Sequence, residues 1–321
     1  MTKHNPNEKF KAKTGGQALI EGVMMRGVSK EAMACRLPSG EIDLEVWDLK
    51  YPAGKAPWYR KVPFLRGIFN FADSLIDGYR CLSKSADKQL TDDDEEELSK
   101  FEQWLDDKLG DKLMPVVSGI SMVIGIGLAL VLFMLLPAFI SKLIDKYIIS
   151  LSPFAKNCVE GVLKISIFLA YTKITSLMSD IATTYRYHGA EHKTIACYES
   201  GEELKVENVR KQTRFHPRCG TSFIFLVLFI SIFVFTVVGV PWNNIFVRMG
   251  FKLLLLPVIV GIAYELIRLA GRYDNIATRI ISAPGLWVQR ITTSEPDDKQ
   301  IECAIAALEA VLPENSEEDR W

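Results

Sequence analysis

The hydrophobic positions of the chain are gathered into long blocks. No charged residue occurs in residues 115–141, and a second uncharged stretch covers residues 219–247. Each block exceeds the roughly 20 residues that a helix needs to cross about 30 Å of hydrocarbon. The pattern therefore predicts two membrane-spanning helices.

Two shorter apolar stretches predict further spans. Residues 159–178 carry Lys164 and Lys173, one near each end, where long basic side chains can reach the headgroups. Residues 252–267 are apolar apart from Lys252 and Glu265. Four spans would place both termini on the same side of the membrane.

Basic residues predict which side that is. They are dense between the second and third spans and after the fourth, and sparse in the other two connections. The dense set is Arg186, Lys193, Lys205, Arg210, Lys211, Arg214 and Arg218, with Arg268, Arg272, Arg279 and Arg290 after the last span. Cytoplasmic loops carry such an excess, so we expect the middle loop and both termini to be cytoplasmic. Residues 1–10 have no apolar core of a signal peptide, so insertion is expected to depend on the internal spans.

The pattern divides the chain into four segments. Residues 1–58 form a cytoplasmic region in which 32–37 and 42–47 alternate like a β-hairpin around Pro38-Ser39-Gly40-Glu41. Residues 59–112 hold an amphipathic helix over 60–84 and the acidic run 92–97, which is typical of a solvated linker. The membrane region is 113–280, including the His-rich loop 179–221, and a cytoplasmic segment, 281–321, follows.

The final segment predicts an amphipathic helix. Apolar residues recur at helical spacing up to about Leu312, and Ser294 stands where an N-cap is expected, with an acidic residue three positions later. The fold class is thus mainly α: a polytopic helical membrane protein with about four spans, a small mixed α/β N-terminal region and a C-terminal amphipathic helix.

Composition narrows the class of protein. The 321 residues are 49% hydrophobic and 24% charged, with a formal net charge of −1, so nucleic acid is not an expected partner. Mean hydropathy is +0.12 despite the many charges, which reflects their segregation from the apolar blocks. The six cysteines contain no C-x-x-C pair, which argues against a disulfide framework or zinc ribbon and suits a reducing compartment.

Candidate chemistry is concentrated where three of the four histidines lie. On a helix, His188 and His192 are four residues apart and share a face. With Glu191 they form H-x-x-E-H, the inverted zincin pattern, in which the glutamate is the general base on metal-bound water. A third ligand would come from His216 or Cys219, with Glu199 behind them. The expected cofactor is a divalent metal, zinc before others.

Two other interpretations of these residues stay open. In the first, the histidines bind no metal and form hydrogen bonds to backbone and carboxylate groups at a helix end, where Gly189 weakens the helix. Cys219 would otherwise be a reactive thiol, favoured as thiolate by Arg214, His216 and Arg218, although the sequence names no group that orients a histidine base.

Two more groups of residues suggest functional or locking roles. Glu265 and Arg268 are three residues apart and Arg272 continues the row, which predicts an ion pair that locks the bundle or lines a cavity. The glycine-rich segment 15–27 predicts tight turns or close backbone approach, and it lacks the P-loop pattern. Its Glu21 and Arg26 would join the histidine site if the segment folds beneath the bundle.

Several of these motifs together are similar to one family. Residues 15–27, 188–193, 214–223 and 284–287, with 295–298, resemble the bacterial YqhQ-like family, a domain-of-unknown-function group described as predicted metal-dependent enzymes. The resemblance extends from about residue 14 to 312. It implies a multi-span protein of the bacterial inner membrane and supplies no substrate.

The sequence thus supports one leading function and two alternatives. The leading hypothesis is a metal-dependent membrane enzyme, hydrolytic in type, with its site at the cytoplasmic face. The first alternative is a non-catalytic assembly or scaffold factor that binds other membrane proteins. The second is an oligomeric transporter or channel that uses Lys164, Lys173 and Glu265 within the membrane. Expected partners are the lipid bilayer, other membrane proteins or further copies of this chain.

Overall fold

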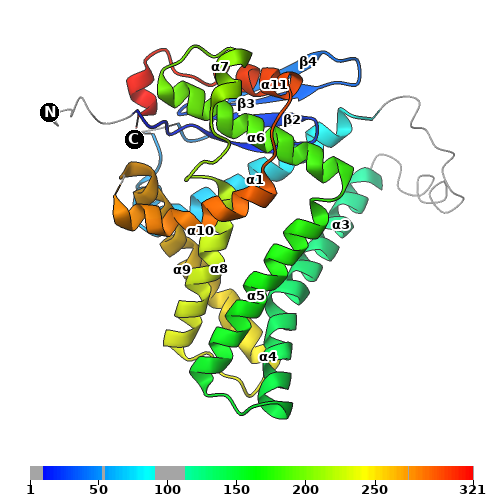
Figure 1. The fold of residues 1–321 in the computed structure, drawn as a ribbon, viewed down its shortest axis with the longest axis vertical. Coiled ribbons are helices and arrows are strands. Elements are labelled where there is room, and N and C mark those ends of the chain that lie inside the picture. The colour runs from blue at the N-terminus through cyan, green and yellow to red at the C-terminus, as the bar shows by residue number, and fades with distance from the viewer. Residues whose placement is uncertain (1–9, 53–54, 91–112, 274, 321) are drawn as a thin grey trace, which may run out of the picture. The chain divides into compact units, whose positions relative to one another are not determined.

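The computed structural model describes residues 10–52, 55–90, 113–273 and 275–320 (Figure 1). The predicted acidic run 92–97 lies outside the described residues. The chain forms two compact units that interleave along the sequence. The first unit comprises residues 1–89, 169–231 and 255–321, and the second comprises residues 90–168 and 232–254.

A four-stranded antiparallel sheet opens the first unit. Its strands β1 (Gly15–Leu19), β2 (Gly22–Arg26), β3 (Lys30–Arg36) and β4 (Ile42–Asp48) pair in chain order. The predicted hairpin is confirmed as β3 and β4. The glycine-rich segment, for which only turns or close approach were predicted, supplies two further strands, joined by a tight turn in which Glu21 has a φ of +48°.

The two central strands, β2 and β3, are buried on both faces, and their successive side chains point to opposite sides. Val23, Met25, Ala32 and Ala34 pack with residues of α6 (Ser179–Ser200) and α11 (Asp298–Glu309). The intervening residues Met24, Met33 and Cys35 join Leu19 and, from α1 (Leu65–Asp87), Cys81. The sheet therefore lies between α6 and α11 on one face and α1 on the other (Figure 1).

The predicted amphipathic helix is α1, preceded by a 3-10 turn at Trp58–Arg60. Its buried positions are small residues, among them Gly67, against Tyr264, and Gly78, against Gln17. Leu75 and Ile76, which lie at apolar positions of the predicted helical repeat, are 57% and 66% exposed. Small residues let the backbone of α1 approach its neighbours closely, which leaves these larger side chains outside.

Two shorter helices and a final turn complete the first unit: α7 (Val206–Lys211), α10 (Ile276–Thr292) and the 3-10 turn Ser316–Asp319. The prediction that Ser294 caps the last helix is wrong. Asp297 is the N-cap of α11: its side chain accepts from the Gln300 amide, and the Gln300 side chain bonds the Asp297 amide in return. Ser294 instead donates its own backbone amide to the Tyr185 carbonyl.

Three helical stretches are long and apolar enough to cross a membrane. In the first, α3 (Leu113–Leu130) continues through a π-helical turn, Val131–Leu135, into α4 (Leu136–Tyr147). The other two are α8 (Gly220–Val238) and α9 (Ile245–Arg272). A fourth crossing exists only if α5 (Pro153–Thr175) and α6, which meet at 102°, form one broken span. The predicted four spans are therefore three to four candidates.

Candidate functional site

The structure brings three potential ligand atoms together in the first unit. His188 and His192 lie one turn apart on α6, with ring centroids 4.4 Å apart. Cys219, the residue before α8, meets them from a distant part of the chain. One ligand atom from each of the three residues lies within 4.8 Å of the others. The helical i, i+4 geometry predicted for the histidines is present.

Backbone carbonyls set the tautomers of both histidines through hydrogen bonds with their Nδ1 atoms. Nδ1 of His188 lies 2.8 Å from the Thr292 carbonyl oxygen, and Nδ1 of His192 lies 2.6 Å from that of Arg214. A carbonyl oxygen only accepts, so each Nδ1 is the donor and, in a neutral ring, each Nε2 keeps its lone pair. Backbone carbonyls orient metal-binding histidines in the same way.

The two histidines and Cys219 face a shared space. His188 Nε2 lies 3.1 Å from Cys219 Sγ. His192 Nε2 is buried and has no hydrogen-bond partner among the described residues. A buried polar nitrogen without a partner is costly, so this nitrogen is suited to binding a ligand.

The electrostatics of Cys219 differ from those of other buried cysteines. Burial raises the pKa of Cys35 to about 12 and that of Cys303 to about 11. Burial also opposes ionisation of Cys219, but the neighbouring His188 and His192 lower the pKa of its thiol well below the ordinary value of 9.0. The Thr221 amide, in the first turn of α8, also reaches Sγ at 3.4 Å. Cys219 is therefore disposed to be a thiolate, the form that binds metals.

Glu191 lies beside this cluster, and the glycine-rich segment reaches the site through it. The Glu191 side chain is buried and is hydrogen-bonded by the Gly16 backbone amide. A Cβ at Gly16 would stand 3.0 Å from Glu191 Cγ and 2.5 Å from the Met24 carbonyl oxygen. Only glycine lets β1 approach this closely, so the predicted close backbone approach occurs at Gly16.

Glu21 and Arg26 do not join the histidine site. Glu21, in the β1–β2 turn, accepts a hydrogen bond from the Tyr187 hydroxyl at 3.1 Å. Arg26 forms ion pairs with Glu31, at 3.0 Å, and with Asp77, at 3.3 Å. Both side chains therefore have partners outside the cluster.

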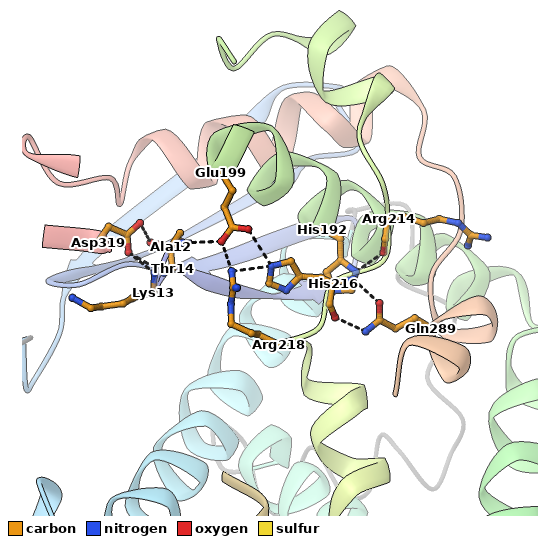
Figure 2. Close-up of polar contacts among 10 residues, drawn as sticks. All are labelled: Ala12, Lys13, Thr14, His192, Glu199, Arg214, His216, Arg218, Gln289 and Asp319. Atoms are coloured by element: carbon orange, nitrogen blue, oxygen red, sulfur yellow. Dashed lines mark hydrogen bonds and ion pairs between the residues drawn. The ribbon is translucent and has the colours of Figure 1, made fainter. Parts of the chain in front are cut away.

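His216 is not one of the three clustered residues. It belongs to a neighbouring group of polar contacts, shown in Figure 2. Its backbone amide and carbonyl both bond the side chain of Gln289, at 2.8 and 2.6 Å. Its Nε2 accepts from Arg218 at 3.1 Å, and Arg218 in turn pairs with Glu199. Burial, assisted by the charge of Arg218, lowers the His216 pKa well below 6.5, which keeps the ring neutral. Cys219 is thus the better placed of the two predicted third ligands.

Gly189 has a tertiary reason to stand between the histidines. A Cβ at this position would lie 3.2 Å from the Ser294 carbonyl carbon and closer still to its oxygen. The segment after α10 therefore rests directly on the backbone of α6. Thr292, whose carbonyl orients His188, is the last residue of α10 and directly precedes this segment. Neither Thr292 nor Gln289 was a predicted site residue, since nothing in their local sequence marks them.

The predicted ion-pair row on α9 has a different partner. Glu265 accepts from Arg66 of α1, with Nε to Oε1 at 2.7 Å, and from the Phe64 amide at 3.2 Å. The charge of Arg268 also acts on Glu265. Arg272 lies over the ring of Tyr273, 5.6 Å from its centroid. Glu265 therefore joins α1 to α9 and stands apart from the histidine cluster.

Comparisons with known proteins place the chain in a family. The family model described as "Protein of unknown function (DUF1385)" matches residues 62–314. The chain belongs to this family. The "Uncharacterized protein YqhQ" of Bacillus subtilis (strain 168) is 34% identical over 313 residues, which cover 97% of this chain and 95% of that protein. No solved structure matches the chain at a significant level. The resemblance inferred from the motifs is therefore confirmed, and the matched region includes the entire histidine–cysteine cluster.

Proposed function

We propose that this protein is a metal-dependent membrane enzyme, hydrolytic in type, whose metal is held by His188, His192 and Cys219. The observation that carries the proposal is the convergence of one ligand atom each from His188, His192 and Cys219, while both Nδ1 atoms bond backbone carbonyls. A cysteine and two histidines suit zinc. Three protein ligands leave one position of a tetrahedral ion open, as a catalytic zinc requires.

Glu191 is the residue best placed to act as the general base. It is the glutamate of the H-x-x-E-H pattern, its side chain is buried, and the charges of His192 and His188 both act on it. A bound zinc would supply Lewis acidity and an acidified water, and Glu191 would accept a proton from that water. The Gly16 amide fixes the carboxylate, so the base and the ligands belong to one packed unit.

The membrane setting of the proposed enzyme rests on the apolar helices and the distribution of basic residues. Three helices, or four with the broken pair, are suited to crossing a bilayer. Arginine and lysine are concentrated in the connection that contains the cluster. With the broken pair counted as the fourth crossing, we assign the protein to the bacterial inner membrane, with both termini and the site on the cytoplasmic side.

Metal analysis of detergent-purified protein tests the proposal. Wild type, incubated with zinc and then freed of excess, is expected to hold about one ion per chain by mass spectrometry. His192→Gln and Cys219→Ser should lose it. His216→Gln is the matched control: another buried histidine beside the cluster, outside the ligand set, and it should keep the metal. Wild-type protein without metal, or a His192→Gln variant with as much metal as wild type, would refute the proposal.

Glu191→Gln separates the base from the ligands. This variant should hold as much zinc as wild type, because the carboxylate is outside the set of three ligand atoms. Once a hydrolysable substrate is found, the same variant should turn it over at least about 100-fold more slowly, the usual contribution of a general base. A variant that loses the metal would make Glu191 a ligand instead.

One observation favours a second candidate function, a cysteine nucleophile. Cys219 Sγ lies 3.1 Å from His188 Nε2, and the Thr292 carbonyl orients that ring, which supplies the third group that the sequence alone did not reveal. This function requires metal-free protein in which iodoacetamide labels Cys219 faster than the other cysteines, with the rate falling in His188→Gln. Zinc that protects Cys219 from labelling would favour the metal enzyme.

A further inference from the structure

Helix α10 turns its apolar side away from the rest of the first unit. Ile276, Ile280 and Trp287 share one helical face and are 79%, 67% and 53% exposed. The buried side consists mostly of small or polar residues: Thr278, Ser282, Gly285, Val288, Gln289 and Thr292. A surface helix of a soluble domain has the reverse arrangement, with its apolar stripe toward the core. The exposed side of α10 is therefore suited to an apolar environment.

Hydrogen bonds fix which side of α10 faces inward. The Gln289 side-chain amide donates to the Ser222 hydroxyl at 3.0 Å and to the His216 carbonyl at 2.6 Å. The Thr292 carbonyl oxygen lies 2.8 Å from Nδ1 of His188. A rotation of α10 that buried the apolar stripe would break these contacts. The exposure of the stripe is thus built into the packing of the helix.

The position of α10 relates this exposed side to the candidate spans. The helix begins at Ile276, four residues after α9 ends at Arg272. It also lies across the first turn of α8, where a Cβ at Gly285 would stand 2.7 Å from Cα of Ser222 (Figure 1). Ser222 directly precedes the apolar run of α8, and both α8 and α9 are candidate spans. Helix α10 therefore lies where one span begins and the other ends.

The residues around the stripe are those found at membrane surfaces. Arg279 and Arg290 are exposed and lie beside the stripe on the helix. The sequence has no acidic residue at positions 275–294. Tyr273, between α9 and α10, is 47% exposed, and with Trp287 it supplies the aromatic residues that are enriched at the headgroup level. Arginine in the same layer is attracted to anionic lipids.

We propose that the exposed face of α10, formed by Ile276, Ile280 and Trp287 with Arg279 and Arg290, binds the surface of an anionic phospholipid bilayer. The apolar side chains enter the boundary between headgroups and acyl chains, and the arginines lie beside the phosphates. The opposite side of α10 contacts the candidate metal site, so this binding holds that site next to the lipid surface. The inference rests on the membrane setting proposed above.

A spin label on this face tests the proposal in full-length protein reconstituted into phosphatidylcholine and phosphatidylglycerol vesicles. Ile280→Cys introduces an exposed thiol, whereas all native cysteines except Cys158 are buried. Wild type treated in parallel measures the background labelling. Oxygen concentrates in lipid and a neutral nickel chelate stays in water, so their collisions with the label report its surroundings. We expect frequent collisions with oxygen and few with nickel at position 280.

Two further cysteine variants make each outcome decisive. Leu44→Cys lies on β4, is 44% exposed in wild type, and should collide mainly with nickel. Phe229→Cys lies within α8, is 60% exposed, and should collide mainly with oxygen if α8 crosses the bilayer.

A label at position 280 that collides with nickel as often as the one at position 44, while position 229 is in lipid, overturns the proposal and leaves the spans standing. Exclusion of both reagents from position 280 also overturns it, because a second copy or another protein then covers the face. Frequent nickel collisions at position 229 refute the membrane setting and the proposal with it.

Lipid charge tests the two arginines. The label at position 280 should meet less nickel in vesicles with phosphatidylglycerol than in phosphatidylcholine alone, because the anionic surface draws α10 inward. Combining Arg279→Gln with Arg290→Gln should remove this difference. Equal nickel collisions in both lipids, with both arginines present, would refute the preference for an anionic surface.

Discussion

Replacing Gly189 by alanine is the sharpest structural test of the candidate metal site. Gly189 lies between the two histidines on α6, where the segment after α10 crosses the helix. An added Cβ would stand 3.2 Å from the Ser294 carbonyl carbon and well inside 3.0 Å of its oxygen, a separation that real Cβ atoms essentially never show. The opposing atom is backbone, so it cannot rotate away, and the segment or the helix must shift.

Two opposing effects, helix propensity and overpacking, set the change in stability of Gly189→Ala. Alanine favours a helix over glycine by about 1 kcal/mol. Overpacking a well-packed contact costs about 1–3 kcal/mol. We therefore expect Gly189→Ala to lie between neutral and about 2 kcal/mol less stable than wild type. The shift also displaces the Thr292 carbonyl from His188 Nδ1, and loss of such an orienting partner typically weakens metal binding about 10–100-fold.

Gly250→Ala is the matched control for helix propensity. Gly250 lies within α9, and nothing stands within 4 Å of a Cβ built there. This variant should be as stable as wild type or up to about 1 kcal/mol more stable. The difference in stability between the two alanine variants thus isolates the overpacking cost, about 1–3 kcal/mol. Each kcal/mol lowers the unfolding midpoint by roughly 2–4 °C in a domain of this size.

Thermal unfolding and zinc affinity are measured on both variants in the same detergent. The reasoning predicts that Gly189→Ala melts below Gly250→Ala and binds zinc more weakly than wild type. Equal midpoints for the two alanine variants would falsify the packing argument. Unchanged zinc affinity in a destabilised Gly189→Ala would instead show that the Thr292 carbonyl does not orient His188 for metal binding.

Three further substitutions test contacts that position the site. Gln289→Leu leaves the buried amide and carbonyl of His216 without partners and should cost about 1–3 kcal/mol or more in chemical unfolding. Asp297→Ala removes the N-cap of α11 and should cost about 1 kcal/mol, whereas Ser294→Ala should cost much less; equal losses would reinstate the cap expected from sequence. Glu265→Gln should lower stability by about 1 kcal/mol, with no further loss when its arginine partner on α1 is also neutralised.

Local patterns in the sequence determined the elements that carry the site. Uncharged apolar blocks predicted the helices able to cross a membrane, because length and hydropathy are properties of a contiguous segment. The i, i+4 spacing placed His188 and His192 on one face of α6 for the same reason. Alternating residues likewise predicted the β3–β4 hairpin.

Only the tertiary structure decided which distant groups meet those elements. Thr292, which orients His188, is 104 residues away, and Arg66, which pairs with Glu265, is 199 residues away. Cys219 and His216 are equally plausible ligands from spacing alone, yet the start of α8 turns one toward the cluster while Arg218 and Gln289 hold the other. Hydrogen bonds of this kind depend on how elements pack, which periodicity does not encode.

The buried charges of the second unit likewise depend on the tertiary structure and not on local sequence patterns. Lys164 was expected to reach toward the headgroups, and Glu160, Arg248 and Lys252 were not predicted site residues. In the structure all four are buried together. Each residue taken singly is compatible with a helix end near the membrane surface. Their common burial is decided by the face that each helix turns toward the other.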